Sequence, residues 1–125
     1  MPLARFGATV LDCPDPLALA EFYAAVLGGT PDVSPDEPGE DVWVDLRIPD
    51  GPALAFQGAP GHVAPPWPSP AGAQQFHLDV RVADLDAAEK EVLALGARAL
   101  DNTDRTRTWR VYADPAGHPF CLCAD

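Results

Sequence analysis

The sequence predicts an α+β fold built from two tandem copies of one βαβββ module. Two observations lead to this prediction. A helical segment with the same beginning and the same end occurs twice, and a ten-residue block containing a tryptophan and ending in glycine also occurs twice. Since each helix covers only one face of its sheet, we expect the two uncovered sheet faces to form a shared cleft.

Both predicted helices begin at an acidic cap and end at a Leu-Gly pair. The first lies in DPLALAEFYAAVLGG, with Asp15 as N-cap and Pro16 at the first helical position, and it ends at Gly28. The second lies in DLDAAEKEVLALGA, with Asp84 as N-cap, and it ends at Gly96. Apolar residues recur at helical spacing in both segments, which predicts one buried face on each helix.

The strands repeat in the same order as the helices. The block VWVDLRIPDG matches TWRVYADPAG, so that Trp43 falls on Trp109 and Gly51 falls on Gly117. A short apolar strand follows each block, ALAFQ in the first half and PFCLC in the second. One further strand precedes each helix. The order strand–helix–strand–strand–strand is therefore expected twice.

The strand before the second helix, FHLDVRV, alternates apolar and polar residues. Period-two alternation places the two sets on opposite faces of a sheet. The set expected under the second helix is Phe76, Leu78, Val80 and Val82. The set expected to line the cleft is His77, Asp79 and Arg81.

The length of 125 residues fits a single domain, residues 1–125. We expect the first module at about residues 4–58 and the second at about 74–125, joined by a proline-rich connection at about 59–73. Five prolines in GAPGHVAPPWPSPAG exclude a helix or an inner strand there. Trp67 lies among them and is expected to anchor this connection to the body.

Charge and cysteine content exclude several classes of partner. The net charge of −11 argues against nucleic acid and against an anionic membrane surface. No apolar run is long enough to cross a membrane, and the N-terminus lacks the apolar core of a signal peptide. Three cysteines without framework spacing argue against disulfides and predict a reducing, cytoplasmic setting. A homodimer through a sheet edge or a helix face stays open.

Several segments together resemble the glyoxalase / bleomycin-resistance / extradiol-dioxygenase family, the vicinal oxygen chelate superfamily. They are the paired βαβββ order, FYAAVLGG after an acidic cap, and the turn DPAGHPF. The segments LDCPDPLALAEFY, LAFQ, PPWP and HLDVRVADLDAAE are most similar to the glyoxalase-like domain subgroup of high-GC actinobacteria. The resemblance covers nearly the whole chain. It implies a small organic ligand between the modules, with either lyase or isomerase chemistry or non-catalytic drug binding.

The resemblance also implies where a metal would be held. Active family members place a ligand, usually His, in the first strand of each module and a Glu in the fourth strand. His77 matches the second-module His, but the other three positions hold Ala8, Ala55 and Cys121. Gln57 faces the same side as Ala55 and offers only a weak oxygen donor. Because zinc sites use three or four strong protein ligands, we expect no complete metal site and no firm cofactor, but a divalent zinc or copper ion stays open because His77 and Cys121 are both competent ligands.

The candidate site residues follow from this resemblance and from strand alternation. The candidate catalytic residues are His77, as a general base or ligand, and Cys121, as a nucleophile. Each has a structural alternative, because a core histidine and a small buried cysteine are common. The candidate ligand-binding residues are Trp43, Gln57, Asp79, Trp109 and Cys123. Whether the protein is an enzyme, a non-catalytic binder or a structural module with a filled cleft stays open at this point.

Overall fold

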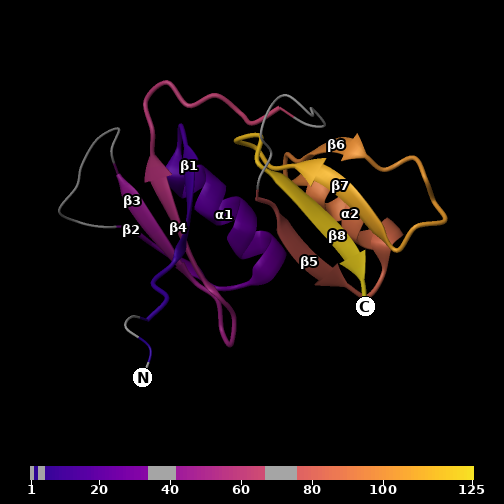
Figure 1. Ribbon diagram of the computed structural model, residues 1–125, viewed down its shortest axis with the longest axis horizontal. Coiled ribbons are helices and arrows are strands. Elements are labelled where there is room, and N and C mark those ends of the chain that lie inside the picture. Colours follow the sequence, from indigo (N-terminus) through magenta and orange to yellow (C-terminus); the bar gives the residue numbers. More distant parts are fainter. Residues whose placement is uncertain (1, 3–4, 34–41, 67–75) are drawn as a thin grey trace. The chain divides into compact units, whose positions relative to one another are not determined.

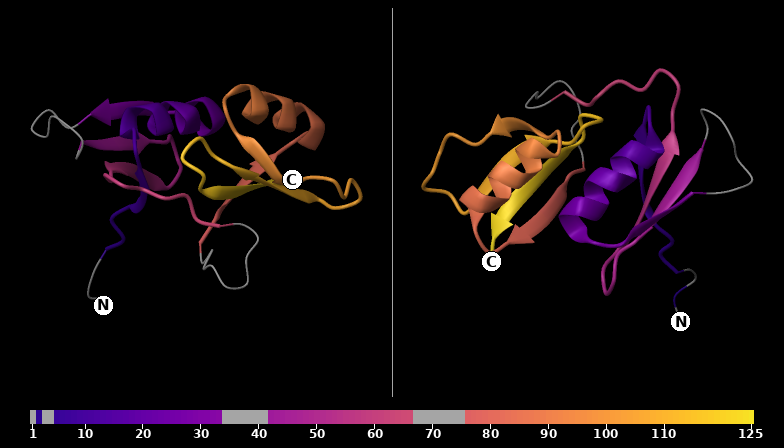
Figure 2. Two further views of the ribbon diagram at one scale, coloured as in Figure 1. Left: turned by 90° about the horizontal axis from the view of Figure 1, so that it is seen from above. Right: turned by 180° about the vertical axis from the view of Figure 1, so that it is seen from behind.

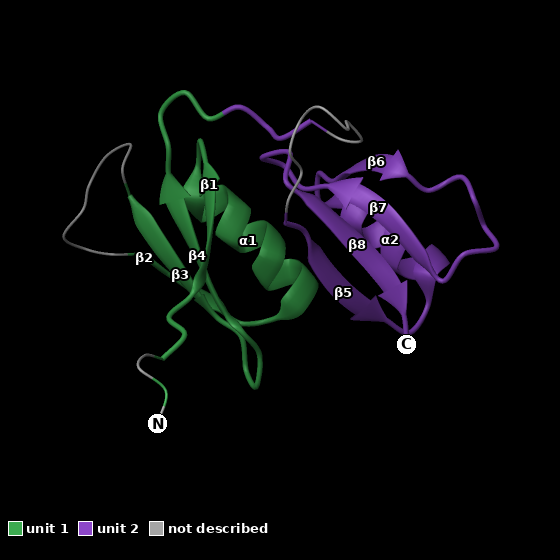
Figure 3. Cartoon of the chain, viewed as in Figure 1, with its two compact units in different colours: residues 1–62 green, residues 63–125 purple. Residues whose placement is uncertain are grey.

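Each half of the chain forms a four-stranded sheet with one helix, as the repeat predicts. The computed structural model describes residues 2, 5–33, 42–66 and 76–125, so Trp67 lies outside the described residues. The chain divides into two compact units, unit 1 (Met1–His62) and unit 2 (Val63–Asp125), shown in Figure 3. Both units have the order βαβββ, which confirms the tandem-module fold. The cleft shared by the modules stays a prediction.

Unit 1 consists of β1 (Thr9–Cys13), α1 (Pro16–Leu27), β2 (Thr30–Val33), β3 (Trp43–Arg47) and β4 (Ala53–Gly58). Its sheet has the strand order β1-β4-β3-β2 (Figure 1). Strand β1 runs parallel to β4, whereas β3 is antiparallel to both of its neighbours. Helix α1 lies over one face of this sheet and leaves the other face uncovered by a helix of unit 1 (Figure 2).

Local signals set the two ends of α1, and aromatic packing holds it to the sheet. The carboxylate of the N-cap, Asp15, accepts a hydrogen bond from the amide of Ala18 at 3.1 Å. The helix ends at Gly28, whose φ of 86° suits glycine. Tyr23 of α1 is fully buried and stacks on Phe56 of β4, with ring centroids 5.8 Å apart. This contact lies at the centre of the apolar core of unit 1.

Unit 2 consists of β5 (Leu78–Val82), α2 (Leu85–Ala94), β6 (Arg98–Asp101), β7 (Trp109–Ala113) and β8 (Pro119–Ala124). Its sheet has the order β5-β8-β7-β6, with β5 parallel to β8 and the other pairs antiparallel (Figure 1). Helix α2 covers one face of this sheet (Figure 2). Neither helix in the described ranges has the length and apolar character that a membrane crossing needs.

The strand register shows that the sequence repeat is also a structural repeat. In unit 1, Val10 of β1 pairs with Ala55 of β4. In unit 2, Asp79 of β5 pairs with Cys121 of β8 at the equivalent place in the parallel ladder. Each position on the open face of one sheet therefore has a defined counterpart in the other.

One residue of the alternating segment departs from its predicted place. Strand β5 begins at Leu78, and Phe76 lies before it with 88% of its surface exposed. Alternation fixes the side of a residue only within a paired strand, so Phe76 is not held under α2 and its predicted burial is wrong. Val80, in the middle of β5, is buried as predicted.

Charged and polar side chains join α2 to the sheet in unit 2. Arg110 of β7 is only 4% exposed, and its Nη2 donates a hydrogen bond to Asp86 of α2 at 2.9 Å. Glu89, on the next turn of α2, accepts hydrogen bonds from the Tyr112 hydroxyl at 2.8 Å and from the Asn102 amide at 2.7 Å. Helix α2 is therefore held by a charge network, whereas α1 is held by apolar packing.

This network predicts a specific sensitivity to acid. Although burial alone raises the pKa of Glu89, hydrogen bonds from Asn102, Tyr112 and Arg105 bring it below its ordinary value. A carboxylate with a lowered folded-state pKa stabilises the fold above its unfolded-state pKa, and this contribution is lost as the pH falls through the folded value. Between about pH 5 and about pH 3, the wild type should lose more unfolding free energy than Glu89→Gln.

Urea denaturation at the two pH values measures this difference. Glu91→Gln is the matched control, because Glu91 is an exposed carboxylate on the same helix. It should show the acid dependence of the wild type. An unchanged acid dependence in Glu89→Gln would contradict the assignment.

Candidate functional site

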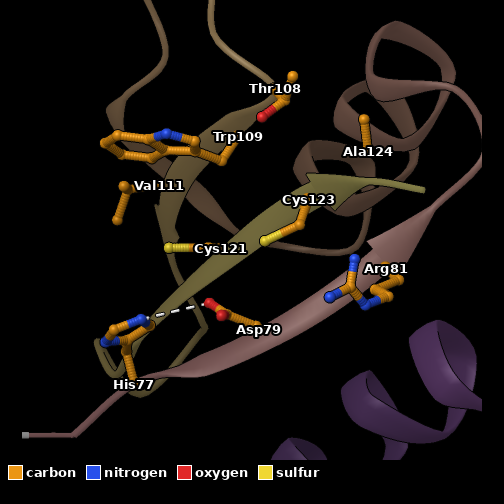
Figure 4. Close-up of a pocket in the computed structure, with 9 residues that line it drawn as sticks. All are labelled: His77, Asp79, Arg81, Thr108, Trp109, Val111, Cys121, Cys123 and Ala124. Atoms are coloured by element: carbon orange, nitrogen blue, oxygen red, sulfur yellow. Dashed lines mark ion pairs between the residues drawn. The ribbon is translucent and has the colours of Figure 1, made fainter.

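The face of the unit 2 sheet opposite α2 carries a pocket (Figure 4). Its volume of about 470 Å³ lies in the range of roughly 300–1,000 Å³ that is typical of small-ligand sites. The pocket is lined by residues in or next to β5, β7 and β8: His77, Asp79, Arg81, Thr108, Trp109, Val111, Cys121, Cys123 and Ala124.

Strand alternation explains why these side chains meet on one face. Most of the lining residues occupy alternate positions on three neighbouring strands: Asp79 and Arg81, Trp109 and Val111, and Cys121 and Cys123. The residues that alternate with them are buried on the side of α2: Val80, Arg110, Tyr112 and Leu122. One face of the sheet therefore supports the helix, and the other supplies the pocket.

A polar cluster formed by His77, Asp79 and Cys121 lies at one end of the pocket. The Nε2 atom of His77 lies 3.2 Å from Oδ1 of Asp79. Asp79 also interacts with the thiol of Cys121, its partner in the β5–β8 ladder. One donor atom from each of the three residues can be chosen so that all lie within 4.8 Å of one another. In Figure 4 the three side chains point into the same part of the pocket.

The two thiols of the pocket are held in their protonated form. Burial, followed by the nearby charge of Asp79 and the thiol of Cys123, raises the pKa of Cys121 to about 12. Burial and the charge of Asp79 also raise the pKa of Cys123. Since the thiolate is the nucleophile, this environment disfavours the predicted nucleophilic role of Cys121. It suits a small wall group, or a ligand that loses its proton to a metal.

The indole of Trp109 forms the other end of the pocket (Figure 4). Trp109 is 40% exposed, and the guanidinium of Arg107 lies 3.8 Å from the centroid of its ring. Arg107 is itself held by Asp101, with Nη2 2.8 Å from Oδ1. The Arg107–Asp101 pair thus packs against one face of the indole. Sequence reasoning did not identify Arg107, although its position two residues before Trp109 was a usable signal.

The structure brings most of the predicted site residues together. The pocket contains five of them: His77, Asp79, Trp109, Cys121 and Cys123. Trp43 and Gln57 lie opposite each other in the β3–β4 ladder of unit 1, where the indole of Trp43 donates to Asp45 at 3.0 Å. They do not line this pocket, and their ligand-binding role stays a prediction. Val111 was missed, although alternation from Trp109 points to it.

The sequence profile of the family described as the glyoxalase-like domain matches residues 8–123. This chain belongs to that family. The match spans both modules of the glyoxalase-like protein and includes every pocket residue except Ala124. No curated protein matches its sequence.

Solved structures of related proteins share the fold of this glyoxalase-like protein. The fosfomycin resistance protein FosX from Mesorhizobium loti superposes with a TM-score of 0.70 at 15% identity, covering 98% of this chain and 92% of that chain. A mutant of FosX from Listeria monocytogenes, complexed with Mn(II) and 1S,2S-dihydroxypropylphosphonic acid, gives 0.74 at 14% identity, covering 99% and 94%. A glyoxylase/bleomycin resistance protein/dioxygenase domain from Frankia sp. EAN1pec gives 0.67 at 14% identity, covering 98% of each chain.

The donor set here differs from the metal site that the family implies. The polar cluster of unit 2 offers an imidazole nitrogen, a carboxylate oxygen and a thiol sulfur. The counterpart positions of unit 1 offer no donor, because they hold Ala8, Val10 and Ala55. Manganese prefers oxygen-rich octahedral sites, whereas thiol and imidazole ligands suit zinc. The residues present therefore do not fit a hard ion such as Mn(II).

Proposed function

We propose that this glyoxalase-like protein binds a small organic molecule in the unit 2 pocket and transfers a proton on it, in lyase or isomerase chemistry. One observation carries the proposal: the His77–Asp79 pair, at 3.2 Å, lies in a pocket of small-molecule size that has an aromatic wall. A base with its orienting group, in a concave site, is the arrangement that general acid–base catalysis requires.

The chemistry assigned to the pair is proton transfer without a co-reactant. The carboxylate of Asp79 lies beside one ring nitrogen of His77, which orients the ring and fixes its tautomer. The other nitrogen can then take a proton from a carbon next to a carbonyl group. In an isomerase that acts on an α-hydroxy carbonyl compound, the same proton returns to the former carbonyl carbon while the hydroxyl proton moves to the former carbonyl oxygen, so atoms and electrons balance. The protonated thiols supply a weakly polar wall beside the reacting carbon.

Trp109 provides a prediction about ligand affinity. Trp109→Ala should weaken binding of an unsaturated or aromatic ligand by about 2- to 10-fold, because an aromatic stacking contact contributes about 0.5–1.5 kcal/mol. Trp109→Phe should restore most of the affinity. Trp43→Ala is the matched control, since Trp43 is the counterpart of Trp109 in unit 1 and does not line this pocket. Calorimetric titration of the variants measures the change, and equal losses for Trp109→Ala and Trp43→Ala would contradict it.

A ligand screen followed by an exchange assay tests the proposed function. The panel contains α-dicarbonyl–thiol adducts, fosfomycin and cationic antibiotics, and the readout is the thermal midpoint of unfolding. A true ligand at 100 times its Kd stabilises the fold by about 2.7 kcal/mol and should stabilise Trp109→Ala less. Each hit is then incubated in deuterated water with the wild type and with His77→Ala. Deuterium uptake that needs His77 supports proton transfer, and uptake independent of His77 refutes it.

A second candidate function is drug binding without turnover. It is favoured by the carboxylate of Asp79, which is 63% exposed at the pocket, in a chain of net charge −11. A cationic ring system could stack on Trp109 and face this carboxylate. Under this reading, cationic antibiotics raise the thermal midpoint, Asp79→Asn removes the effect, and no bound compound exchanges deuterium or changes structure.

A further inference from the structure

We propose that unit 2 binds one thiophilic divalent ion of the zinc type on His77, Asp79 and Cys121, and that this site disfavours hard ions such as Mn(II). The inference goes beyond the proposed function, because the ion needs no organic ligand in order to bind. It comes from the disagreement between the donor set of this chain and the ion in the Listeria relative.

The spacing of the three donors is close to that of a tetrahedral zinc site. Typical Zn–N and Zn–O bonds at a tetrahedral angle place nitrogen and oxygen about 3.4 Å apart, and the observed distance between Nε2 of His77 and Oδ1 of Asp79 is 3.2 Å. The same geometry places sulfur about 3.6 Å from nitrogen. All three donors lie within 4.8 Å of one another, so the longest donor–donor distance exceeds the ideal value by at most about 1.2 Å.

The sheet fixes the backbone of two of these ligands and leaves one side of the site open. Asp79 and Cys121 are register partners in neighbouring parallel strands. Cys121 is buried, whereas the side chains of His77 and Asp79 are 45% and 63% exposed. An ion held by these three groups would keep a free position toward the pocket. Three protein ligands with one open position are typical of catalytic zinc sites.

The identity of the third ligand decides which ions the site accepts. A cysteine ligand binds as the thiolate and favours zinc, cadmium and copper over manganese and magnesium. The family resemblance implies a glutamate oxygen at the position of Cys121. Among the described residues this cluster offers three donors, so the one sulfur has a large effect on selectivity.

A bound ion would also change the role of His77. A ring nitrogen that ligates a metal cannot take a proton at that atom, so the proton-transfer proposal applies to the metal-free chain. The metal proposal and the proton-transfer proposal can therefore be refuted independently of each other. The ion is tested by itself, and the organic ligand is tested on protein dialysed against a chelator.

The test is a titration of the chelator-treated full chain with Co(II), Cd(II), Zn(II) and Mn(II), one ion at a time. We expect one Cd(II) or Co(II) per chain, with an ultraviolet sulfur-to-metal charge-transfer band that Zn(II) abolishes by competition. Mn(II), followed by electron paramagnetic resonance, should bind at least about 100-fold more weakly than Zn(II). Binding of Cd(II) or Co(II) without a sulfur-to-metal charge-transfer band would overturn the proposal. Binding of Mn(II) as tight as that of Zn(II) would also overturn it.

Two variants and a matched control assign the ligands. Cys121→Ser should remove the band, and Asp79→Asn, at an exposed side chain, should lower the affinity for Zn(II) at least about 10-fold without loss of fold. Cys123→Ser is the control, because Cys123 is the second thiol on the same strand and the same pocket wall. It should keep both the band and the affinity. Loss of the band in Cys123→Ser but not in Cys121→Ser, or unchanged affinity in Asp79→Asn, would refute the assignment.

Discussion

Arg110→Ala should lower the free energy of unfolding by about 1–3 kcal/mol, because it removes a buried partner of two carboxylates and leaves them only partly compensated by Arg105. The guanidinium of Arg110 lies 2.9 Å from Asp86 and 3.5 Å from Glu89, and its side chain is 5% exposed. Without it, Glu89, whose side chain is only 12% exposed, keeps Arg105 at 3.1 Å but loses its buried positive neighbour. Urea denaturation followed by circular dichroism measures the loss.

A double-mutant cycle separates the network from simple loss of packing. Glu89→Gln removes a charge that Arg110→Ala would leave with Arg105 as its remaining arginine partner, so the double variant should be less destabilised than the sum of the two single variants. Coupling of about 0.5–3 kcal/mol is usual for residues of one such network. Arg98→Ala is the control, since Arg98 is an exposed arginine in β6. Additive losses, or a loss from Arg110→Ala that matches the control, would contradict the role of the network.

The elements of the fold could be predicted because the signals that set them are local in the sequence. The carboxylates of Asp15 and Asp84 accept hydrogen bonds from amides three residues later, at 3.1 Å in both helices. The φ of 86° at Gly28 is a conformation that favours glycine. Such interactions lie within a few residues of one another, so their sequence pattern carries the information. Two copies of the same pattern then predicted two copies of the same unit.

The side of each strand could also be predicted, but the distances across strands could not. Alternation placed His77 and Asp79 on the face opposite α2, as the pocket confirms. The 4.8 Å cluster with Cys121 depends on the register of β5 against β8, which no local pattern specifies. The same holds for Arg110, because a strand position facing a helix is expected to be apolar. Its partners belong to α2 and come close only in the folded unit.

Phe120→Ala should lower the free energy of unfolding by about 3–5 kcal/mol, as is usual when a fully buried phenylalanine is truncated. Phe120 has no exposed surface and stacks on Tyr112, with ring centroids 5.8 Å apart. It also precedes Cys121 on β8, so the cavity would lie directly behind the pocket wall. Because part of that cavity collapses, β8 should shift and the donor atoms of the polar cluster should separate.

Phe56→Ala in unit 1 is the matched control for Phe120→Ala. It separates an effect on the pocket from a general loss of stability. Phe56 is also fully buried and stacks on a tyrosine, Tyr23, at the same centroid distance of 5.8 Å, so its truncation should cost a similar free energy. None of the unit 1 residues that the structure describes lines the pocket. We therefore expect Cd(II) and small-molecule affinity to fall in Phe120→Ala and to persist in Phe56→Ala, measured at a temperature where both variants are folded. If both variants lost affinity equally, the core of unit 1 would also shape the site. If both variants kept their affinity, β8 would be held in place without Phe120.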